Sequence, residues 1–182
     1  MYSQSIVTRH QQGAVLITGL IILMVITLIG TTAMHGTTLE EKMTGNFRDA
    51  NLAFQAGEAS LRSGENWLVV QTGAPLASGD GSSGVWGLDT PDANTANSRP
   101  WWSDNSMTWW SNNSVVMSSM IGVAAQPRYI IEEQAYVKDH LGTPDYGEMG
   151  SGRHFHRITG RATGGSVDSM VLLQSVFAWR FQ

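Results

Sequence analysis

The sequence predicts an α+β protein in which one long N-terminal α-helix packs on a small antiparallel β-sheet. Residues 1–70 contain no proline, and apolar residues recur there at helical spacing. Residues 128–182 contain β-branched and aromatic runs that alternate as strands do. Residues 71–127 are rich in Gly, Ser, Asn and Trp, a composition that favours loops. The sequence therefore predicts a helix followed by a second region, residues 71–182, here called the head.

Composition excludes several classes of function. The 182-residue chain holds 11 Lys and Arg against 15 Asp and Glu, a net charge of −4, and it has no basic stripe of the kind that nucleic acids need. No nucleic-acid partner is therefore expected. The chain has no Cys, which excludes a disulfide scaffold, cysteine-ligated zinc and thiol catalysis.

An uncharged apolar segment occupies residues 14–34, which is 21 residues. A membrane-spanning helix needs about 20 apolar residues and satisfies its own backbone hydrogen bonds, so this segment is long enough to cross a bilayer. Arg9 precedes it and favours a cytoplasmic N-terminus. Residues 35–70 continue the helix as an amphipathic segment with apolar residues at Leu39, Met43, Phe47, Ala50, Phe54, Leu61 and Leu68.

Three interpretations of the apolar segment stay open on these residues alone. A secretory signal would be cut near Thr31 and Ala33, although the apolar run is longer than the ~7–15 residues of a signal core. A plain N-terminal anchor would stay uncut. A polar leader, residues 1–13, would be removed just before the apolar run, and Gly13 followed directly by Ala14 fits this third interpretation.

Three segments of the N-terminal region resemble a known family. They are residues 12–17, residues 38–49 with the sequence Leu-Glu-Glu-Lys-Met, and residues 52–59 with the sequence Ala-Phe-Gln-Ala-Gly-Glu-Ala. Together they resemble the PilX-type minor pilins of type IV pili. Residues 129–133 and 157–165 resemble the same family more loosely. The resemblance implies a type IV pilin-like fold.

The resemblance also implies how the chain is processed and assembled. A prepilin peptidase would cut between Gly13 and Ala14 and methylate the new amine of Ala14. The chain would reside in the inner membrane, with its N-terminus in the cytoplasm and its head in the periplasm. It would then enter an extracellular pilus as a structural subunit that helps to prime assembly. The side chains that line the filament core would be Leu16, Ile17, Leu20, Ile21, Leu23, Met24 and Leu28.

The implied partners are other minor pilins, the major pilin, a PilY-type tip adhesin, the prepilin peptidase and the inner-membrane assembly platform.

Thr18 departs from the family pattern, because most pilins carry Glu at this fifth mature position. The resemblance implies that this Glu pairs with the terminal amine of a neighbouring subunit, and Thr18 has no charge with which to do so. A subunit without the Glu suits the first position of a filament, which predicts a place at or near the tip.

Three alternatives remain. A pseudopilin of a type II secretion system is one, because the K-type pseudopilin lacks the same Glu, although it carries a larger inserted domain. A membrane-anchored binding module that never polymerises is the second, and a secreted hydrolase is the third. Adhesion, twitching motility and DNA uptake are all compatible with the pilus interpretation.

The head contains two tryptophan pairs, Trp101-Trp102 and Trp109-Trp110. They are interpreted as rings that cover the helix and the sheet, in preference to an exposed aromatic platform for a sugar or a protein. In a strand, one ring of each pair would face the core and the other the solvent. The predicted strands are residues 128–137, 155–163 and 168–181, with Gly164-Gly165 as a hairpin turn. In the last strand, Val171, Leu173, Phe177, Trp179 and Phe181 are expected to face the helix.

No arrangement of residues predicts catalysis, so neither an enzyme nor a cofactor is expected. His154 and His156, with Asp139 and His140, are residue types that can ligate a metal ion. An exposed polar strand face is the preferred interpretation, and no metal is expected. Glu132 and Glu133 are adjacent, so in a strand they face opposite ways and cannot act as a paired acid and base.

Overall fold

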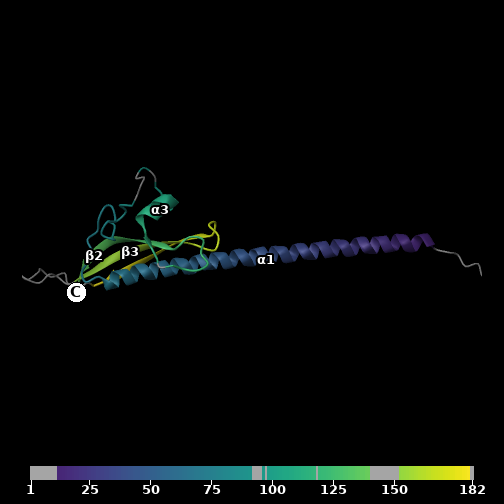
Figure 1. The fold of residues 1–182 in the computed structure, drawn as a ribbon, viewed down its shortest axis with the longest axis horizontal. Coiled ribbons are helices and arrows are strands. Elements are labelled where there is room, and N and C mark those ends of the chain that lie inside the picture. The colour runs from purple at the N-terminus through teal and green to yellow at the C-terminus, as the bar shows by residue number, and fades with distance from the viewer. Residues whose placement is uncertain (1–11, 92–95, 97, 118, 140–151, 181–182) are drawn as a thin grey trace, which may run out of the picture. The chain divides into compact units, whose positions relative to one another are not determined.

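The computed structural model describes residues 12–91, 96, 98–117, 119–139 and 152–180 (Figure 1). The chain divides into two compact units, Met1–Gly45 and Asn46–Gln182. Helix α1, Gln12–Val70, begins in the first unit and ends in the second. Its extent confirms the long N-terminal helix that the sequence predicts, and it is the one helix in the described part of the chain that is long and apolar enough to cross a membrane.

The second unit contains one antiparallel sheet with the strand order β1-β2-β3-β4. The strands are β1, Val115–Val116, β2, Arg128–Lys138, β3, Gly152–Thr163, and β4, Met170–Trp179. The helix and this sheet confirm the α+β class. Three strands agree with the sequence prediction, and β1 is an addition of two residues at the edge of β2.

The connection between β3 and β4 is longer than the predicted Gly164-Gly165 turn. It runs over residues 164–169, and the Gly164 N–H donates to the Ser169 carbonyl over 2.7 Å. Asp49 of α1 holds this hairpin by accepting hydrogen bonds from the Gly165 N–H and from the N–H and hydroxyl of Ser166. The extra length therefore brings the hairpin backbone to the helix.

Helix α1 packs on the sheet through its small residues. Ala53, Ala56, Gly57, Ser60 and Gly64 are all buried. A Cβ atom on Gly57 would lie 2.9 Å from Leu173 Cδ1, and one on Gly64 would lie 2.8 Å from Ile158 Cγ2. Side chains of the sheet thus fill the space beside each glycine, which brings the helix backbone close to the strands.

The larger apolar residues of the predicted amphipathic stripe mostly lie elsewhere. Leu39, Met43, Phe47 and Phe54 are exposed, as is Ala50, whereas Leu68 is fully buried. The prediction assigned the buried face by hydrophobicity. Within the second unit, close helix–sheet packing selected small residues instead, so Phe47 and Phe54 are exposed while Leu61 is half-buried against the core. Leu39 and Met43 belong to the first unit.

The sheet has a core on each face. On the side of α1, the core consists of Leu68, Val85, Tyr129, Ile131 and Ile158. On the opposite side, here called the tryptophan side, it consists of Trp86, Trp101, Trp110 and Ile130. Two short helices supply Trp101 and Trp110, namely α2, Trp101–Asp104, and α3, Met107–Asn113. Figure 1 shows α3 across the sheet from α1. Both lie in a segment for which the sequence predicted loops.

Candidate functional site

The N-terminal part of α1 is apolar and exposed. Seven side chains predicted to line a filament core have exposed fractions of 54–73% in the isolated chain, namely Leu16, Ile17, Leu20, Ile21, Leu23, Met24 and Leu28. Fully burying one such side chain is worth about 1.5–3 kcal/mol. This surface is therefore stable only in contact with lipid or with other apolar helices.

Hydroxyl groups within this apolar surface are satisfied by the helix itself. The Thr18 hydroxyl donates to the carbonyls of Ala14 and Val15, each over 3.0 Å. Thr27 makes the same kind of bond to Leu23. Such back-bonding removes the cost of a polar group in a hydrocarbon environment. Thr18 therefore needs no partner from a neighbouring chain, unlike a carboxylate at the same position.

The predicted processing site lies at the start of α1. Gly13 and Ala14 are in its first turn and are exposed. No heavy atom from elsewhere in the described structure comes within 4 Å of the position that a Cβ would take on Gly13. In the described part of the chain, no other element packs against Gly13.

A buried ion pair lies on the tryptophan side of the sheet. The carboxylate of Glu132 is fully buried and accepts hydrogen bonds from Arg157 Nε over 2.9 Å and from Arg157 Nη2 over 2.8 Å. Trp101 Nε1 and the backbone N–H of Asp89 also donate to it, each over 3.1 Å. The Glu132 hydrogen bonds raise the pKa of Arg157 above its ordinary value.

Asp89 and Trp102 complete the surroundings of Arg157. The Asp89 carboxylate accepts from Arg157 Nη2 over 2.5 Å, and the guanidinium lies 5.0 Å from the centre of the Trp102 ring. Asp89 has a φ of 54°, a left-handed conformation that Asp tolerates better than most residues. The loop adopts it where both the N–H and the side chain of Asp89 join the network. The sequence predicts the strand that holds Arg157 but not its place opposite Glu132, because the register of two strands cannot be read from either strand alone.

The tryptophan pairs form a cluster that covers the sheet. Trp101 and Trp110 are buried with ring centroids 5.6 Å apart, while Trp102 and Trp109 are half-buried. One ring of each pair is therefore buried, as expected, although the pairs lie on helices and not on strands. The core interpretation of the pairs fits these positions better than an exposed platform does.

The histidines of β3 lie on the side of α1. His156 is fully buried, and its ring lies 6.2 Å from that of His154, which faces a Glu133 carboxylate oxygen over 3.4 Å. Burial lowers the pKa of His156 to about 4. Among the described residues no group of three His, Cys, Asp or Glu side chains is placed to hold a metal ion, and His140 lies outside those residues.

Glu132 and Glu133 face opposite sides of the sheet, since one binds Arg157 and the other faces His154. This orientation agrees with the prediction that they cannot act as a pair. Phe181 of the last predicted strand lies outside the described residues, while Val171 and Leu173 face α1 as predicted.

Two family models match this chain, one in its N-terminal part and one in its C-terminal part. The family model described as PilX N-terminal matches residues 12–62, and the model described as type IV pilus assembly protein PilX C-term matches residues 74–179. Curated proteins and solved structures gave no match. The C-terminal match alone spans more than half of the chain, and the order of the two matches agrees with the helix and the sheet. The chain therefore belongs to the PilX family of type IV pilus assembly proteins.

Proposed function

We propose that this chain is a minor pilin that helps to prime assembly of the type IV pilus and occupies a position at or near its tip. The observation that carries the proposal is the exposed apolar surface of α1 between Ala14 and Leu28, in a chain whose family assembles type IV pili. Before assembly this surface would contact the inner membrane, and afterwards the helices of other subunits. Apolar contact is kept throughout the transfer, so the move needs no large desolvation of polar groups.

Processing at Gly13 and Ala14 belongs to the same proposal. Prepilin peptidase would cut between them and methylate Ala14, leaving the apolar segment at the mature N-terminus. The partners would be other minor pilins, the major pilin, a PilY-type adhesin and the inner-membrane assembly platform, with the head periplasmic before assembly. The open position of Gly13 supports this proposal.

Thr18 supports a position at the tip. Its hydroxyl is satisfied by the carbonyls of its own helix, so a subunit that carries it is not held beneath the terminal amine of a preceding subunit. Such a subunit can begin a filament. A shaft subunit would instead carry a carboxylate at this position, because its charge pairs with that amine.

The first test is the intact mass and N-terminal residue of the protein from its native host. We expect a chain that begins at N-methylated Ala14. An uncut chain would favour a static anchor, and a start beyond Met34 would favour a secreted protein. Either outcome would overturn the pilus assignment.

The second test is the position of the labelled protein in sheared pili. We expect label at pilus ends for the wild type and label along the shaft for Thr18→Glu. Thr27→Glu is the matched control, because it places the same charge elsewhere on the apolar helix and should reduce incorporation without moving the label to the shaft. Even labelling of the shaft by the wild type would exclude the tip position. Presence in a type II secretion pseudopilus, with no effect of deletion on piliation, would favour a pseudopilin.

A further inference from the structure

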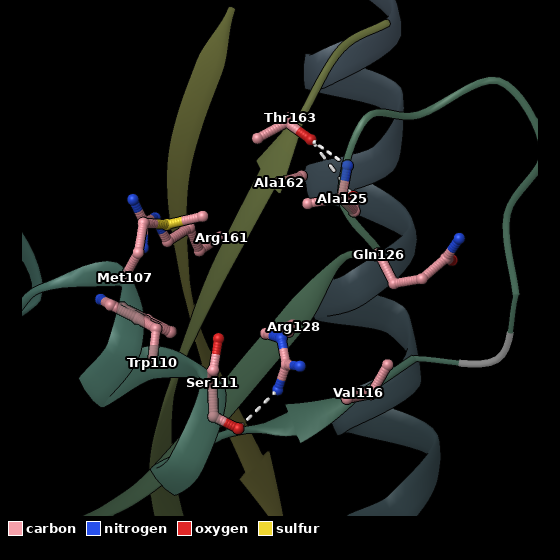
Figure 2. Close-up of a pocket in the computed structure, with 10 residues that line it drawn as sticks. All are labelled: Met107, Trp110, Ser111, Val116, Ala125, Gln126, Arg128, Arg161, Ala162 and Thr163. Atoms are coloured by element: carbon pink, nitrogen blue, oxygen red, sulfur yellow. Dashed lines mark hydrogen bonds between the residues drawn. The ribbon is translucent and has the colours of Figure 1, made fainter. Parts of the chain in front are cut away.

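A pocket of about 240 Å³ lies on the tryptophan side of the head, between α3, β1, β2 and β3 (Figure 2). It is separate from the Glu132–Arg157 network. Its polar lining includes Arg128 from β2 and Arg161 and Thr163 from β3, and its apolar lining includes Met107, Trp110 and Val116. The pocket thus combines cationic groups with apolar walls.

The two arginines occupy directly opposed positions. Arg128 of β2 and Arg161 of β3 are register partners, so their side chains leave the same face of the sheet. Like charges directly opposed across two strands are destabilising. Among the described residues neither arginine forms an ion pair with a carboxylate, whereas Arg157 on the same face binds both Glu132 and Asp89. Two carboxylates therefore neutralise Arg157, whereas the pair Arg128 and Arg161 lacks a counter-charge in the described structure.

Arg161 also has hydrogen-bond donors in excess of good acceptors. Its Nε and Nη2 donate to the Met170 sulfur over 3.1 and 2.9 Å, and a thioether is a weak acceptor. Its Nη1 is buried and has no hydrogen-bond partner in the described part of the chain, and the same holds for Trp110 Nε1. Burial lowers the pKa of Arg161. A buried donor that stays unpaired is costly, and an incoming acceptor would remove that cost.

We propose that this pocket binds a carboxylate of a protein partner, an Asp or Glu side chain of another pilus component. That the partner is a pilus component rests on the proposed function. The guanidinium fork matches a carboxylate in two parallel hydrogen bonds, and Arg128 adds a second positive charge beside it. Arg128 already donates from Nη1 to the Ser111 carbonyl over 3.1 Å, which ties its guanidinium to α3 (Figure 2).

The surroundings favour a protein side chain over a free anion. Met107, Val116 and Met170 are apolar residues near the arginines, with exposed fractions of 46–47%. Arg, Trp and Met are the residue types enriched at the centres of protein interfaces, and all three line this pocket or its edge. The volume is below the ~300–1,000 Å³ of pockets for drug-sized ligands, and it suits one side chain.

The test uses the full chain in detergent micelles with ¹⁵N-labelled tryptophan side chains. N-acetyl-glutamate methylamide is titrated at fixed pH and ionic strength, and N-acetyl-glutamine methylamide serves as the neutral probe of the same shape. We expect a saturable shift of the Trp110 indole signal, identified with Trp110→Phe, and at least tenfold weaker binding of the glutamine probe. No saturable shift, or equal binding of both probes, would overturn the proposal.

Two variants make the result specific. Arg161→Gln should weaken binding of the glutamate probe about tenfold or more, while Arg153→Gln, an exposed arginine of the same strand, should not change it. The other six tryptophan signals report whether each variant keeps its fold. If Arg161→Gln disturbs them, Arg128→Gln takes its place. Inorganic phosphate that binds more tightly than the glutamate probe would assign the pocket to a free anion and overturn the protein carboxylate.

A second arm in the native host separates this inference from the proposed function. Arg161→Gln should keep the Ala14 start and reduce the amount of the protein in sheared pili at least fivefold, while Arg153→Gln keeps both. If the wild-type protein is absent from pili, the proposed function fails even where the glutamate probe binds. If Arg161→Gln enters pili at the wild-type level, the pocket has no pilus partner and the inference fails alone.

Discussion

At the scale of single residues, the head depends on polar groups that are buried with their partners. Glu132 is fully buried and Arg157 is nearly so, and each supplies hydrogen bonds that the other needs. Removing one member of such a pair leaves an uncompensated charge in a medium of low dielectric constant. The same reasoning applies to His156, which is buried in its neutral form because burial has lowered its pKa.

Arg157→Met should destabilise the protein by about 3–5 kcal/mol, because it leaves the Glu132 carboxylate buried without its counter-charge. The double variant Glu132→Leu with Arg157→Met should recover most of that loss, since apolar side chains fill the same space. Urea unfolding followed by tryptophan fluorescence measures both. Arg153→Met controls for loss of a positive charge on the same strand. Equal stability of Arg157→Met and the wild type would show that the pair is solvated.

Acid should destabilise the head through His156. Its folded pKa of about 4 lies below the ordinary histidine value of 6.5, so the unfolded chain binds the proton first as pH falls. The stability is fully present above pH ~6.5 and is lost progressively toward pH ~4, by about 3 kcal/mol in total. In His156→Gln, the urea midpoint of unfolding should change less with pH over this range. An unchanged slope in that variant would mean that His156 does not set the acid response.

At the scale of elements, α1 has two different faces within the second unit. Small residues face the sheet, and the hydroxyl and amide groups of the β3–β4 hairpin bind Asp49 at the start of that face. Larger apolar residues such as Phe47 face outward. The position of the helix on the sheet therefore depends on small residues and on two carboxylates, since Glu65 also accepts a hydrogen bond from the Ser175 hydroxyl of β4 over 3.2 Å.

Gly64→Ala should destabilise the head by about 1–3 kcal/mol, because the new methyl group would lie 2.8 Å from Ile158 Cγ2. Gly45→Ala is the matched change on the same helix, where no atom lies within 4 Å of the new Cβ. That substitution should stabilise by about 0.5–1 kcal/mol, because Ala favours helix. Thermal unfolding of the two variants should shift in opposite directions, and a shift in the same direction would argue against close packing at Gly64.

Asp49→Ala should release the β3–β4 hairpin from α1. The Ser166 hydroxyl and the neighbouring N–H groups lower the pKa of Asp49, so the carboxylate is charged and bound at neutral pH. Hydrogen exchange at the Gly165 and Ser166 amides should accelerate in the variant, while exchange in β2 stays as in the wild type. Glu58→Ala, an exposed carboxylate of the same helix, is the control and should leave the hairpin amides protected.

At the scale of the whole molecule, the two units differ in what they need from other chains. The second unit contains both cores of the sheet, whereas the apolar side chains of the first are exposed. The first unit therefore requires lipid or other helices, and the second supplies its own core. This difference is what the proposed transfer from the membrane to a pilus would require of a subunit.

A chain that begins at Asn46 should fold without detergent, because it keeps both cores and the whole sheet. We expect a cooperative thermal transition in tryptophan fluorescence and a monomeric mass in solution. The full chain in the same buffer without detergent should aggregate. A truncated chain that shows no cooperative transition would mean that the first unit contributes to the stability of the head.

Much of this architecture was predictable from sequence because it follows from periodicity. The long helix, three strands and the side of β4 that faces α1 all follow from the spacing of apolar residues. Which face of α1 meets the sheet was not predictable from hydrophobicity. The glycines on that face act by letting the helix backbone lie close to the strands. The short helices that carry Trp101 and Trp110 were missed because tertiary packing outweighs the local composition. The pairing of Glu132 with Arg157 depends on strand register, which neither strand shows alone.

The small-residue contact has a mechanical consequence. Leu173 and Ile158 occupy the spaces beside Gly57 and Gly64, so the helix and sheet interlock at two points along the helix axis. A force along that axis would shear the contact between the helix and the sheet. Sliding would then push the Leu173 and Ile158 side chains against the larger residues on either side of each glycine. The contacts at Gly57 and at Gly64 must both break before the helix can slide along the sheet. Force applied to one end of the second unit's helix would therefore be passed to all the strands of the sheet, and the head would resist extraction better than a smooth apolar interface of equal area.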